Sequence, residues 1–298
     1  MNKTVLITGA TGFLGSHISL RLFRKGFNII ILKRSFSDLW RINKIINNIK
    51  FYDIDKVELE VPFRENKIDF IIHAATNYGR QKAKLEEIIE TNINYPIKLL
   101  EIAIFYKTDA FFNTDTSLNR YINYYSLSKK QFVEWLRIFK DKIKIFNFKL
   151  EYVYGEMDDY SKFIPFIIRE LILKVKEIKL TGGQQKRDFI YVEDVVSSYE
   201  AILDSFDKYP TGFYEYEIGT GIATSIKEVV LLLKELTLND ETYLNFGGLS
   251  YRDNEIMESK ANLKKIKEDV GWEPKVSLKE GLEKVVNWYK NNIRASDV

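Results

Sequence analysis

The fold of this chain is decided by the stretch Thr8-Gly9-Ala10-Thr11-Gly12-Phe13-Leu14-Gly15. It directly follows an apolar run at residues 5–8 and opens a stretch with helical periodicity, so it predicts a strand, a tight turn and a helix start. Gly9 permits the tight turn, Gly12 lets a diphosphate approach the backbone, and Gly15 allows close packing of the helix. The helix N-terminus offers free N–H groups to an anion. We therefore predict a phosphate-binding turn; an ordinary glycine turn is the alternative.

Outward from this turn, apolar β-branched runs alternate with amphipathic stretches through the first half of the chain. The runs predict strands at residues 5–8, 28–33, 51–53, 70–73, 110–113 and 146–150, and the amphipathic stretches predict helices at 12–25, 85–106 and 125–140. This order is typical of right-handed βαβ units in a parallel sheet with helices on both faces. The predicted fold class is α/β, with a Rossmann-type doubly wound parallel sheet.

The alternation weakens after Tyr154-Gly155, which predicts a smaller, discontinuous C-terminal substrate domain. We expect residues 1–154 plus about 184–218 to form the dinucleotide-binding domain, and about 155–183 plus 219–298 to form the substrate domain. Residues 190–192 and 216–218 are expected to return to the sheet. Open α/β sheets bind ligands at the carboxyl edge of their strands, where the second domain would lie.

Composition excludes several classes of protein. The 298 residues include 45 Lys and Arg against 42 Asp and Glu, a net charge of +3, and 45% are hydrophobic, which is typical of a folded protein that binds neither nucleic acid nor other polyanions. There is no Cys, so disulfides, thiolate zinc sites and cysteine nucleophiles are excluded. The N-terminal residues do not resemble a secretory signal, and no apolar run is long enough to span a membrane. We expect a cytoplasmic enzyme.

The end of the second predicted strand indicates which dinucleotide binds. A carboxylate there would accept a hydrogen bond from a ribose 2′-hydroxyl, whereas cations would pair with a 2′-phosphate. The sequence has Lys33-Arg34 at this point and no acid, which favours NADP(H), with NAD(H) as the alternative. A pair of solvated surface charges would give the same pattern.

A second constellation carries acid–base chemistry. Tyr125 and Lys129 are four residues apart, so a helix places the phenol and the ammonium on one face. The positive charge of the lysine is expected to lower the tyrosine pKa, so that Tyr125 can exchange a proton with a substrate oxygen. Upstream, the strand at 110–113 delivers Thr114 to the same edge, where its hydroxyl can hydrogen-bond the reacting oxygen.

With the glycine turn, the upstream hydroxyl and Tyr-x-x-x-Lys in this order, the chain resembles the extended short-chain dehydrogenase/reductase family, in particular the NAD-dependent epimerase/dehydratase group that acts on nucleotide sugars. The resemblance covers almost the whole length. Further matches are Asp53, His73-Ala74-Ala75, Asn92 and the segments 149–155, 183–194, 217–219, 251–252 and 271–274.

The resemblance implies roles for individual residues. Thr114, Tyr125 and Lys129 would be catalytic. The cofactor would contact Gly9, Thr11, Gly12, Phe13, Leu14, Gly15, Lys33, Arg34, Asp53, Ile54, Ala74, Ala75, Asn92, Tyr125, Lys129, Tyr152 and Val153. The substrate would contact Thr76, Asp115, Thr116, Arg187 and Arg252, with the two arginines on its diphosphate; a domain-closing ion pair is the alternative for each. Asp188, His17 and His73 are expected to be structural, and no metal site is predicted.

The resemblance also limits which reactions of the family are expected for this chain. Dehydratases of the family carry Thr-Asp-Glu where this chain has Thr114-Asp115-Thr116, so dehydration is not expected. The implied activity is NADPH-dependent reduction of the C4 keto group of a nucleotide-linked 4-keto-6-deoxysugar, as in the reductases that complete CDP-linked 3,6-dideoxyhexoses for cell-surface polysaccharide. A nucleotide-sugar 4-epimerase with tightly bound NAD is the first alternative, and a non-catalytic dinucleotide-binding regulator the second.

Family analogy further implies a homodimer, in which the helices near 85–106 and 125–140 form a four-helix bundle. Phe132, Trp135, Leu136 and Phe139 recur at helical spacing, as an interface would require. The same stripe is also what a helix buried in the core of its own chain would show.

Overall fold

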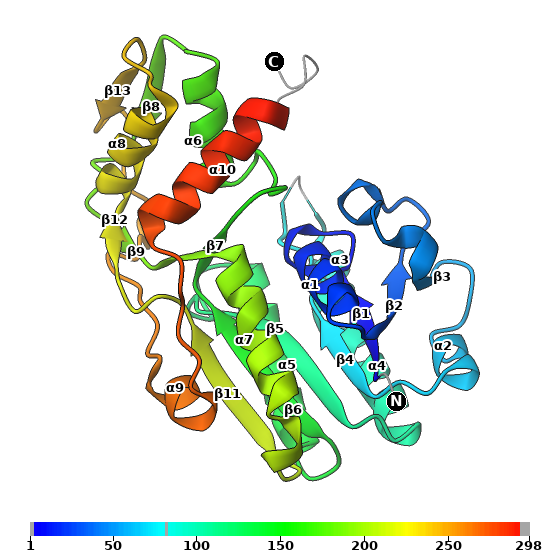
Figure 1. The fold of residues 1–298 in the computed structure, drawn as a ribbon. Helices are drawn as coiled ribbons and strands as arrows, with labels where there is room; N and C mark the ends of the chain where they lie inside the picture. The colour runs from blue at the N-terminus through cyan, green and yellow to red at the C-terminus, as the bar shows by residue number, and fades with distance from the viewer. Residues whose placement is uncertain (1–2, 81–82, 293–298) are drawn as a thin grey trace. The chain divides into compact units, whose positions relative to one another are not determined.

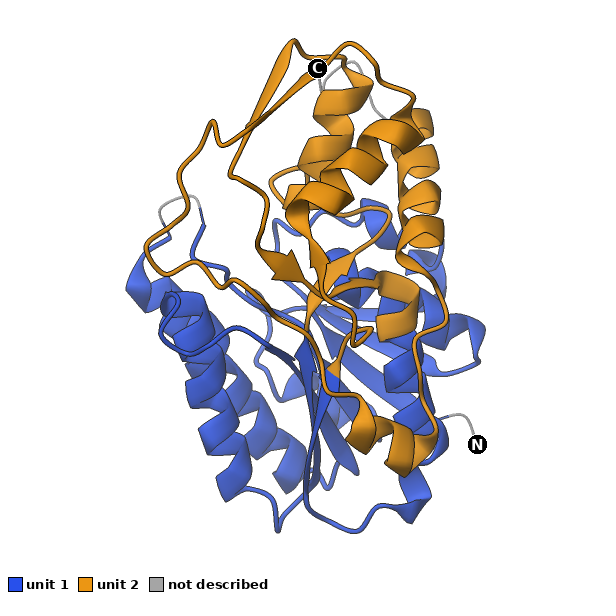
Figure 2. Cartoon of the chain, turned by 90° about the vertical axis from the view of Figure 1, so that its left-hand side faces the viewer, with its two compact units in different colours: residues 1–150, 196–217 blue, residues 151–195, 218–298 orange. Residues whose placement is uncertain are grey.

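A computed structural model describes residues 3–80 and 83–292. The chain divides into two compact units: unit 1 comprises residues 1–150 and 196–217, and unit 2 comprises residues 151–195 and 218–298 (Figure 2). Residues 151–154, 184–195 and 218, which the sequence analysis placed with the dinucleotide-binding domain, belong to unit 2. The expected domains also include residues 1–2, 81–82 and 293–298, which lie outside the described part.

Within the described residues, unit 1 is built on a seven-stranded sheet with the order β11-β6-β5-β4-β1-β2-β3 (Figure 1). The predicted α/β class with a Rossmann-type doubly wound sheet is confirmed, since the strand order reverses between β1 and β4. The strands are β1 (Thr4–Thr8), β2 (Asn28–Lys33), β3 (Lys50–Asp53), β4 (Phe70–His73), β5 (Ala110–Thr116), β6 (Lys144–Leu150) and β11 (Phe213–Ile218).

β5 is three residues longer than the sequence predicts. Its parallel pairing with β6 continues to Thr116, which lies opposite Leu150. The polar run Thr114-Asp115-Thr116 therefore belongs to the strand and does not follow it. Because consecutive strand residues point to opposite faces, Thr114 and Asp115 project to opposite sides of the sheet.

Helices cover both faces of this sheet (Figure 1). Phe111 packs with Leu100 and Phe132 in one core cluster, on the face covered by α4 and α5. Phe112 points to the other face, where its ring lies 6.4 Å from that of Tyr199 on α7. The helices are α1 (Phe13–Arg24), α2 (Val61–Glu65), α3 (Leu85–Ile89), α4 (Tyr95–Phe105), α5 (Tyr124–Ile138) and α7 (Val192–Asp204), with short 3-10 turns η1 (Trp40–Ile42), η2 (Ile46–Asn48) and η4 (Phe206–Lys208).

The predicted helix at 85–106 consists of three segments, because a π-helical turn, η3 (Glu90–Asn94), separates α3 from α4. A π-turn inserts an extra residue into the helical repeat and occurs frequently at functional sites. Here it includes Asn92, whose side chain is fully buried. The predicted stripe on α5 is divided: Phe132 and Leu136 belong to the core cluster, whereas Trp135 is 46% exposed.

Unit 2 contains helices and three small sheets in its described part. The helices are α6 (Phe163–Ile172), α8 (Ile226–Thr237), α9 (Lys264–Val270) and α10 (Leu278–Asn292). The strand pairs are β7 (Tyr152–Tyr154) with β10 (Phe189–Tyr191), β8 (Glu177–Leu180) with β13 (Tyr243–Phe246), and β9 (Lys186–Arg187) with β12 (Thr224–Ser225).

One of the two expected returns to the central sheet is wrong. Residues 190–192 do not join that sheet, because β10 pairs with β7 in a separate two-stranded sheet and Val192 already begins α7. Residues 216–218 do return, as the end of β11. Of the helices in the described chain, none combines the length and the apolar character that crossing a membrane requires.

Candidate active site

The glycine turn after β1 has no room for a side chain at two of its glycines. Gly9 has a φ of +71°, and a Cβ atom at this position would lie 2.6 Å from the backbone nitrogen of Ala75. A Cβ atom on Gly15 would lie 2.2 Å from the carbonyl oxygen of Gly9. The turn therefore needs glycine at both positions, Gly9 for its left-handed backbone and Gly15 for the close approach of the helix to the turn.

The start of α1 suits an anion. Gly12 is its N-cap residue, no side chain of residues 3–80 or 83–292 caps the helix, and its first turn contains no acidic residue. The positive end of the helix dipole is therefore left for a ligand, as a dinucleotide diphosphate requires. Arg41, which the sequence analysis did not single out, donates a hydrogen bond from Nη1 to the carbonyl oxygen of Thr11 at 3.3 Å. Nothing in the local sequence pattern indicates this contact.

The two cations predicted to select NADP(H) both face carboxylates. Lys33 Nζ lies 3.5 Å from Asp53 Oδ2, which also accepts a hydrogen bond from Ser35 Oγ at 2.8 Å. The guanidinium of Arg34 pairs with Asp55. The register of β2 and β3 places Lys33 directly opposite Asp53, and Ile54 follows with its N–H bonded to the Lys33 carbonyl. A 2′-phosphate would have to compete with these acids.

The loop after β4 is held by Asn92. Its Oδ1 accepts hydrogen bonds from the Asn77 N–H at 2.8 Å and the Thr76 hydroxyl at 3.2 Å. Its Nδ2 donates to the Asn77 carbonyl and to Ser128 Oγ, both at 2.9 Å. An amide side chain has two donor and two acceptor positions, so all four are used. Asn92 therefore positions Thr76 and Asn77 after β4. The direct cofactor contact expected of Asn92 stays a prediction.

Tyr125 and Lys129 lie on α5, whose start is defined by a capping box. The Asn123 side chain accepts a hydrogen bond from the Ser126 N–H at 2.8 Å, and Ser126 Oγ accepts one from the Asn123 N–H at 3.2 Å. This places Tyr125 in the first turn and Lys129 one turn later, as the spacing predicts. The Tyr125 ring lies 4.9 Å from the exposed ring of Tyr78.

Burial sets the protonation of this pair. It raises the pKa of Tyr125 well above 10, with the Tyr78 and Asp115 charges acting in the same direction and a hydrogen bond with Thr116 opposing. It lowers the pKa of Lys129 to about 8, although Asp115 raises it. The expected fall in the tyrosine pKa does not occur, because desolvation, the largest influence on this phenol, disfavours its charged form. Tyr125 is therefore a protonated phenol.

Lys129 is a buried ammonium group, 1% exposed. Among residues 3–80 and 83–292, no group accepts a hydrogen bond from its Nζ. A buried charge without a partner is costly, so this group is suited to a polar ligand that brings acceptors with it. The ribose hydroxyls of a dinucleotide would supply such acceptors.

The hydroxyl of Thr114 contacts a residue of α7. Thr114 Oγ1 lies 2.8 Å from the phenolic oxygen of Tyr199, a buried residue of α7. Within the described chain, no hydrogen bond joins Thr114 to Tyr125, which contacts Thr116 instead. The sequence analysis did not select Tyr199. Its burial could have been predicted, because it recurs at helical spacing with the apolar residues Val192, Val195, Val196, Ile202 and Leu203.

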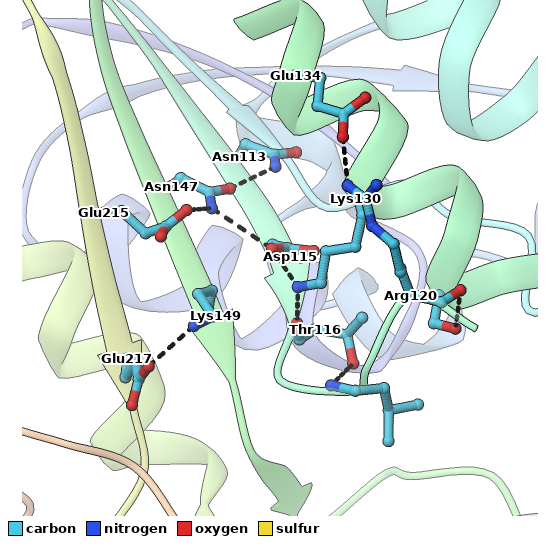
Figure 3. A network of polar contacts seen from close by, with 12 residues as sticks. Asn113, Asp115, Thr116, Arg120, Lys130, Glu134, Asn147, Lys149, Glu215 and Glu217 are labelled. Carbon is cyan, nitrogen blue, oxygen red and sulfur yellow. Dashed lines mark hydrogen bonds and ion pairs between the residues drawn. The ribbon is translucent and has the colours of Figure 1, made fainter. Parts of the chain in front are cut away.

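Asp115 lies in a polar network that runs over β5, β6 and β11 (Figure 3). Lys130 Nζ lies 2.7 Å from Asp115 Oδ2, and Asn147 Nδ2 donates to the same oxygen at 3.4 Å. Asp115 Oδ1 is buried and has no hydrogen-bond partner in the described residues. The carboxylate expected to contact substrate is thus 3% exposed and paired inside unit 1. Thr116 is also buried, with its carbonyl bonded to Lys130.

Unit 2 holds the two arginines expected to bind a diphosphate. Arg187 is buried; its guanidinium pairs with Glu255 and donates to the carbonyl oxygens of Lys186 and Ile256. Its cationic carbon also lies 5.3 Å from the centre of the Tyr152 ring on β7, where Val153 follows. Arg252 is exposed. Arg187 is therefore already engaged, whereas the guanidinium of Arg252 is accessible to solvent.

Asp188 and His73 have structural partners. Asp188 accepts hydrogen bonds from the N–H groups of Thr220, Gly221 and Ala261 at 2.7 to 3.1 Å. His73 Nδ1 lies 2.8 Å from Thr8 Oγ1, and burial holds the pKa of His73 well below its usual value, so the ring is neutral. No group of three or more His, Asp or Glu side chains in residues 3–80 and 83–292 could hold a metal ion.

The doubly wound sheet, the uncapped glycine turn and the Tyr-x-x-x-Lys pair define a dinucleotide-binding α/β protein of the short-chain dehydrogenase/reductase type. Residues 5–219 match the model of the NAD dependent epimerase/dehydratase family. The chain belongs to this family.

Relatives of known name are similar over nearly the whole chain. The CDP-abequose synthase of Salmonella muenchen is 36% identical over 296 residues, covering 96% of this chain and 98% of the relative. The UDP-glucuronate 4-epimerase of Thermodesulfobacterium geofontis is 27% identical, covering 97% and 96%. Among solved structures, the UDP-glucose 4-epimerase of Thermotoga maritima with UDP-glucose superposes with a TM-score of 0.84 at 25% identity, covering 97% and 99%.

Proposed function

We propose that the protein is an enzyme that reduces the C4 keto group of a nucleotide-linked 4-keto-6-deoxysugar with NADPH, and that the substrate is a CDP-linked 3,6-dideoxy sugar used for cell-surface polysaccharide. The nucleotide and the sugar are supported by the similarity to CDP-abequose synthase, whose name gives a CDP-linked sugar as the product. The reaction is supported by the residues of the site.

The observation that carries the proposal is the protonated phenol of Tyr125 one turn of α5 before the buried ammonium of Lys129. Reduction of a ketone requires a proton donor at the carbonyl oxygen, and a phenol whose pKa is raised by burial starts the reaction with its proton in place. A bound nicotinamide supplies hydride-transfer chemistry. Tyr125 would donate its proton to O4, Lys129 would bond the nicotinamide ribose, and Thr114 would orient O4.

The dinucleotide site would be formed by the glycine turn and by Lys129, with Lys33 and Arg34 at the 2′-phosphate. Asp53, Ile54, Ala74 and Ala75 line the neighbouring strand ends, and Tyr152 and Val153 of unit 2 would contact the nicotinamide side. In the described chain, α1 has no side-chain cap and the ammonium of Lys129 has no hydrogen-bond acceptor, and both features fit such a ligand.

The substrate diphosphate would be bound by Arg187 and Arg252 of unit 2, with Thr76 and Thr116 near the sugar. A guanidinium has several donors in one plane, which suits a diphosphate. Arg187 would exchange its contact with Glu255 for the phosphates. We therefore expect Arg252→Ala to raise the KM for the nucleotide sugar more than tenfold, whereas Arg64→Ala, which removes an exposed arginine of unit 1, leaves it unchanged.

A 4-epimerase is the second candidate. It is favoured by the similarity to UDP-glucose 4-epimerase and by the carboxylates that face Lys33 and Arg34, which compete with a 2′-phosphate. Dehydration is opposed by Thr116, because this residue stands where dehydratases of the family carry glutamate and cannot remove a C5 proton.

Incubation of the protein with UDP-, CDP-, GDP- and dTDP-4-keto-6-deoxysugars and either NADPH or NADH tests the proposal. We expect oxidation of NADPH with the CDP-linked ketones, and NMR of the product should show a new C4 hydroxyl. Tyr125→Phe should lose activity and still bind NADPH. Tyr124→Phe, which changes the exposed preceding tyrosine, should retain activity. Near-normal turnover by Tyr125→Phe would contradict the assignment.

We also propose a homodimer formed through the α3–α4 segment and α5 of each chain. The support is apolar side chains that remain exposed on α3 and α5, namely Leu85, Ile89, Trp135 and Ile138. Exposed apolar clusters of this kind are common at protein interfaces.

A further inference from the structure

Tyr199 and Thr114 are joined by a hydrogen bond that the proposed chemistry does not yet use. Their hydroxyl oxygens are 2.8 Å apart. Tyr199 is 1% exposed, and among the described residues its hydroxyl has no other hydrogen-bond partner than Thr114. A buried phenol normally retains such a partner, so the contact defines where the Tyr199 hydroxyl points.

The surroundings of Tyr199 hold its ring in place. The ring stacks on Phe148 with 4.1 Å between centroids and 12° between planes. Phe148 lies on β6 directly opposite Thr114 on β5, so one strand pair supports both partners of the hydrogen bond. The next residue on α7, Glu200, pairs at 2.9 Å with Arg21 of α1 and with Lys25, the C-cap residue of that helix. The phenol of Tyr199 therefore contacts Thr114 from a helix that ion pairs hold against α1.

The chemistry of the two hydroxyls sets the direction of the bond. Burial raises the pKa of Tyr199, so it is a neutral phenol. A phenol is a stronger hydrogen-bond donor than an aliphatic alcohol, so Tyr199 donates and Thr114 Oγ1 accepts. The hydrogen of the Thr114 hydroxyl is then left for another acceptor, and its donor strength is increased by the bond it accepts.

We propose that Tyr199 is a positioning residue, which orients and polarises the Thr114 hydroxyl so that Thr114 donates a hydrogen bond to the reacting oxygen of the substrate. This inference rests on the proposed function, since it needs a substrate oxygen at Thr114. Tyr199 acts only through Thr114 and does not contact the substrate. Its contribution should therefore vanish when the Thr114 hydroxyl is absent.

The test compares Tyr199→Phe with a matched control, Tyr216→Phe. Both substitutions remove one buried phenolic hydroxyl near Phe148, but Tyr216 bonds Tyr209 and not Thr114. We expect Tyr199→Phe to lower kcat about tenfold, the change that about 1.4 kcal/mol of transition-state stabilisation produces, with KM changed less than twofold. Tyr216→Phe should leave kcat unchanged.

A double-mutant cycle separates positioning from general damage to the fold. Thr114→Val removes the hydroxyl, and adding Tyr199→Phe to it should cause no further loss of kcat. If Tyr199→Phe still lowers kcat about tenfold in the Thr114→Val background, or if Tyr216→Phe lowers it as much as Tyr199→Phe does, the proposal is overturned.

A structural measurement keeps this inference distinct from the proposed function. If the wild-type protein converts no nucleotide sugar, the proposed function fails, and crystal structures of wild type and Tyr199→Phe still decide the inference. The Thr114 hydroxyl should lie within hydrogen-bond distance of Tyr199 in the wild type and adopt a different rotamer, or several, in the variant. An unchanged Thr114 rotamer in Tyr199→Phe would refute the positioning role.

Discussion

At the scale of single residues, the site depends on the burial of two titratable groups. Lys129 is a buried cation for which the described residues supply no hydrogen-bond acceptor, and burial lowers its pKa to about 8. Tyr125 keeps its proton for the same reason. Both shifts are what desolvation produces, since it disfavours the charged form of each group. The site therefore combines a proton donor with a group, one helical turn away, that is largely cationic at neutral pH.

This burial predicts how stability changes with pH. Between pH 8 and 10.5, folded Lys129 has lost its proton while the unfolded lysine retains it, so the unfolded chain binds more protons. Stability contributed by this group therefore rises with pH, by about 1.4 kcal/mol per unit. The Lys129→Met variant has no such pH-dependent gain in stability. Its free energy of unfolding relative to wild type should therefore decline from pH 8 to pH 10.

Urea unfolding at pH 7.5, 9 and 10 measures this difference. Lys140→Met, which replaces an exposed lysine just beyond α5, is the control and should keep a constant offset from wild type over the same range. A constant offset for Lys129→Met as well would show that Lys129 is not buried as a shifted cation.

The spacing of Tyr125 and Lys129 predicted their common helix, but not the sign of the tyrosine pKa shift. The sequence shows the charge of the lysine, whereas desolvation depends on the strands and loops that cover both groups. Tyr199 illustrates the same limit. Its place in an apolar helical stripe predicts burial, yet its partner Thr114 is 85 residues away along the chain.

At the scale of elements, the site depends on the β1–α1 turn. Local pattern predicted this turn and six strands of the sheet, because glycines and continuous apolar runs are properties of short segments. Local pattern misplaced residues 190–192, since β10 and a strand of the central sheet have the same apolar composition. Only the pairing with β7 distinguishes them, and pairing is a property of distant segments.

Gly15→Ala tests the turn. A Cβ atom would lie 2.2 Å from the Gly9 carbonyl oxygen, so the helix must move away from the turn. We expect the Kd for NADPH, measured by fluorescence titration, to rise more than tenfold. Gly26→Ala is the matched control beyond the other end of α1, where a Cβ atom meets nothing within 4 Å. It strains a positive φ but should leave NADPH affinity unchanged; equal losses of affinity in both variants would contradict this account.

At the scale of the whole molecule, the proposed catalytic residues and the proposed diphosphate-binding residues belong to different units. Unit 1 contains the glycine turn, Thr114, Tyr125 and Lys129, and unit 2 contains Arg187 and Arg252. Sequence pattern predicted a discontinuous second domain, but the division falls at residue 150 because β7 pairs within unit 2. The proposed dimer belongs to this scale too, since it uses apolar side chains that the single chain leaves exposed.

Ile138→Asp tests the dimer. Ile138 is 68% exposed, so the charge should cost the folded chain little, while burying it at an interface without a partner would be unfavourable. Analytical ultracentrifugation should show a dimer for wild type and a monomer for the variant. Ile222→Asp, equally exposed at 68% but in unit 2, should remain dimeric. A monomeric wild-type protein, or a dimeric Ile138→Asp, would exclude the proposed interface.

The central claim, reduction at C4 with Tyr125 as the proton donor, is tested most directly by following hydrogen from the nicotinamide. NADPH deuterated at the transferred position is incubated with a CDP-4-keto-6-deoxysugar, and the product is examined by NMR. The account predicts one deuterium at C4 of the sugar for each NADPH consumed. Consumption of NADPH without deuterium at C4 of the sugar, or recovery of the unchanged ketone with no NADPH consumed, would contradict it.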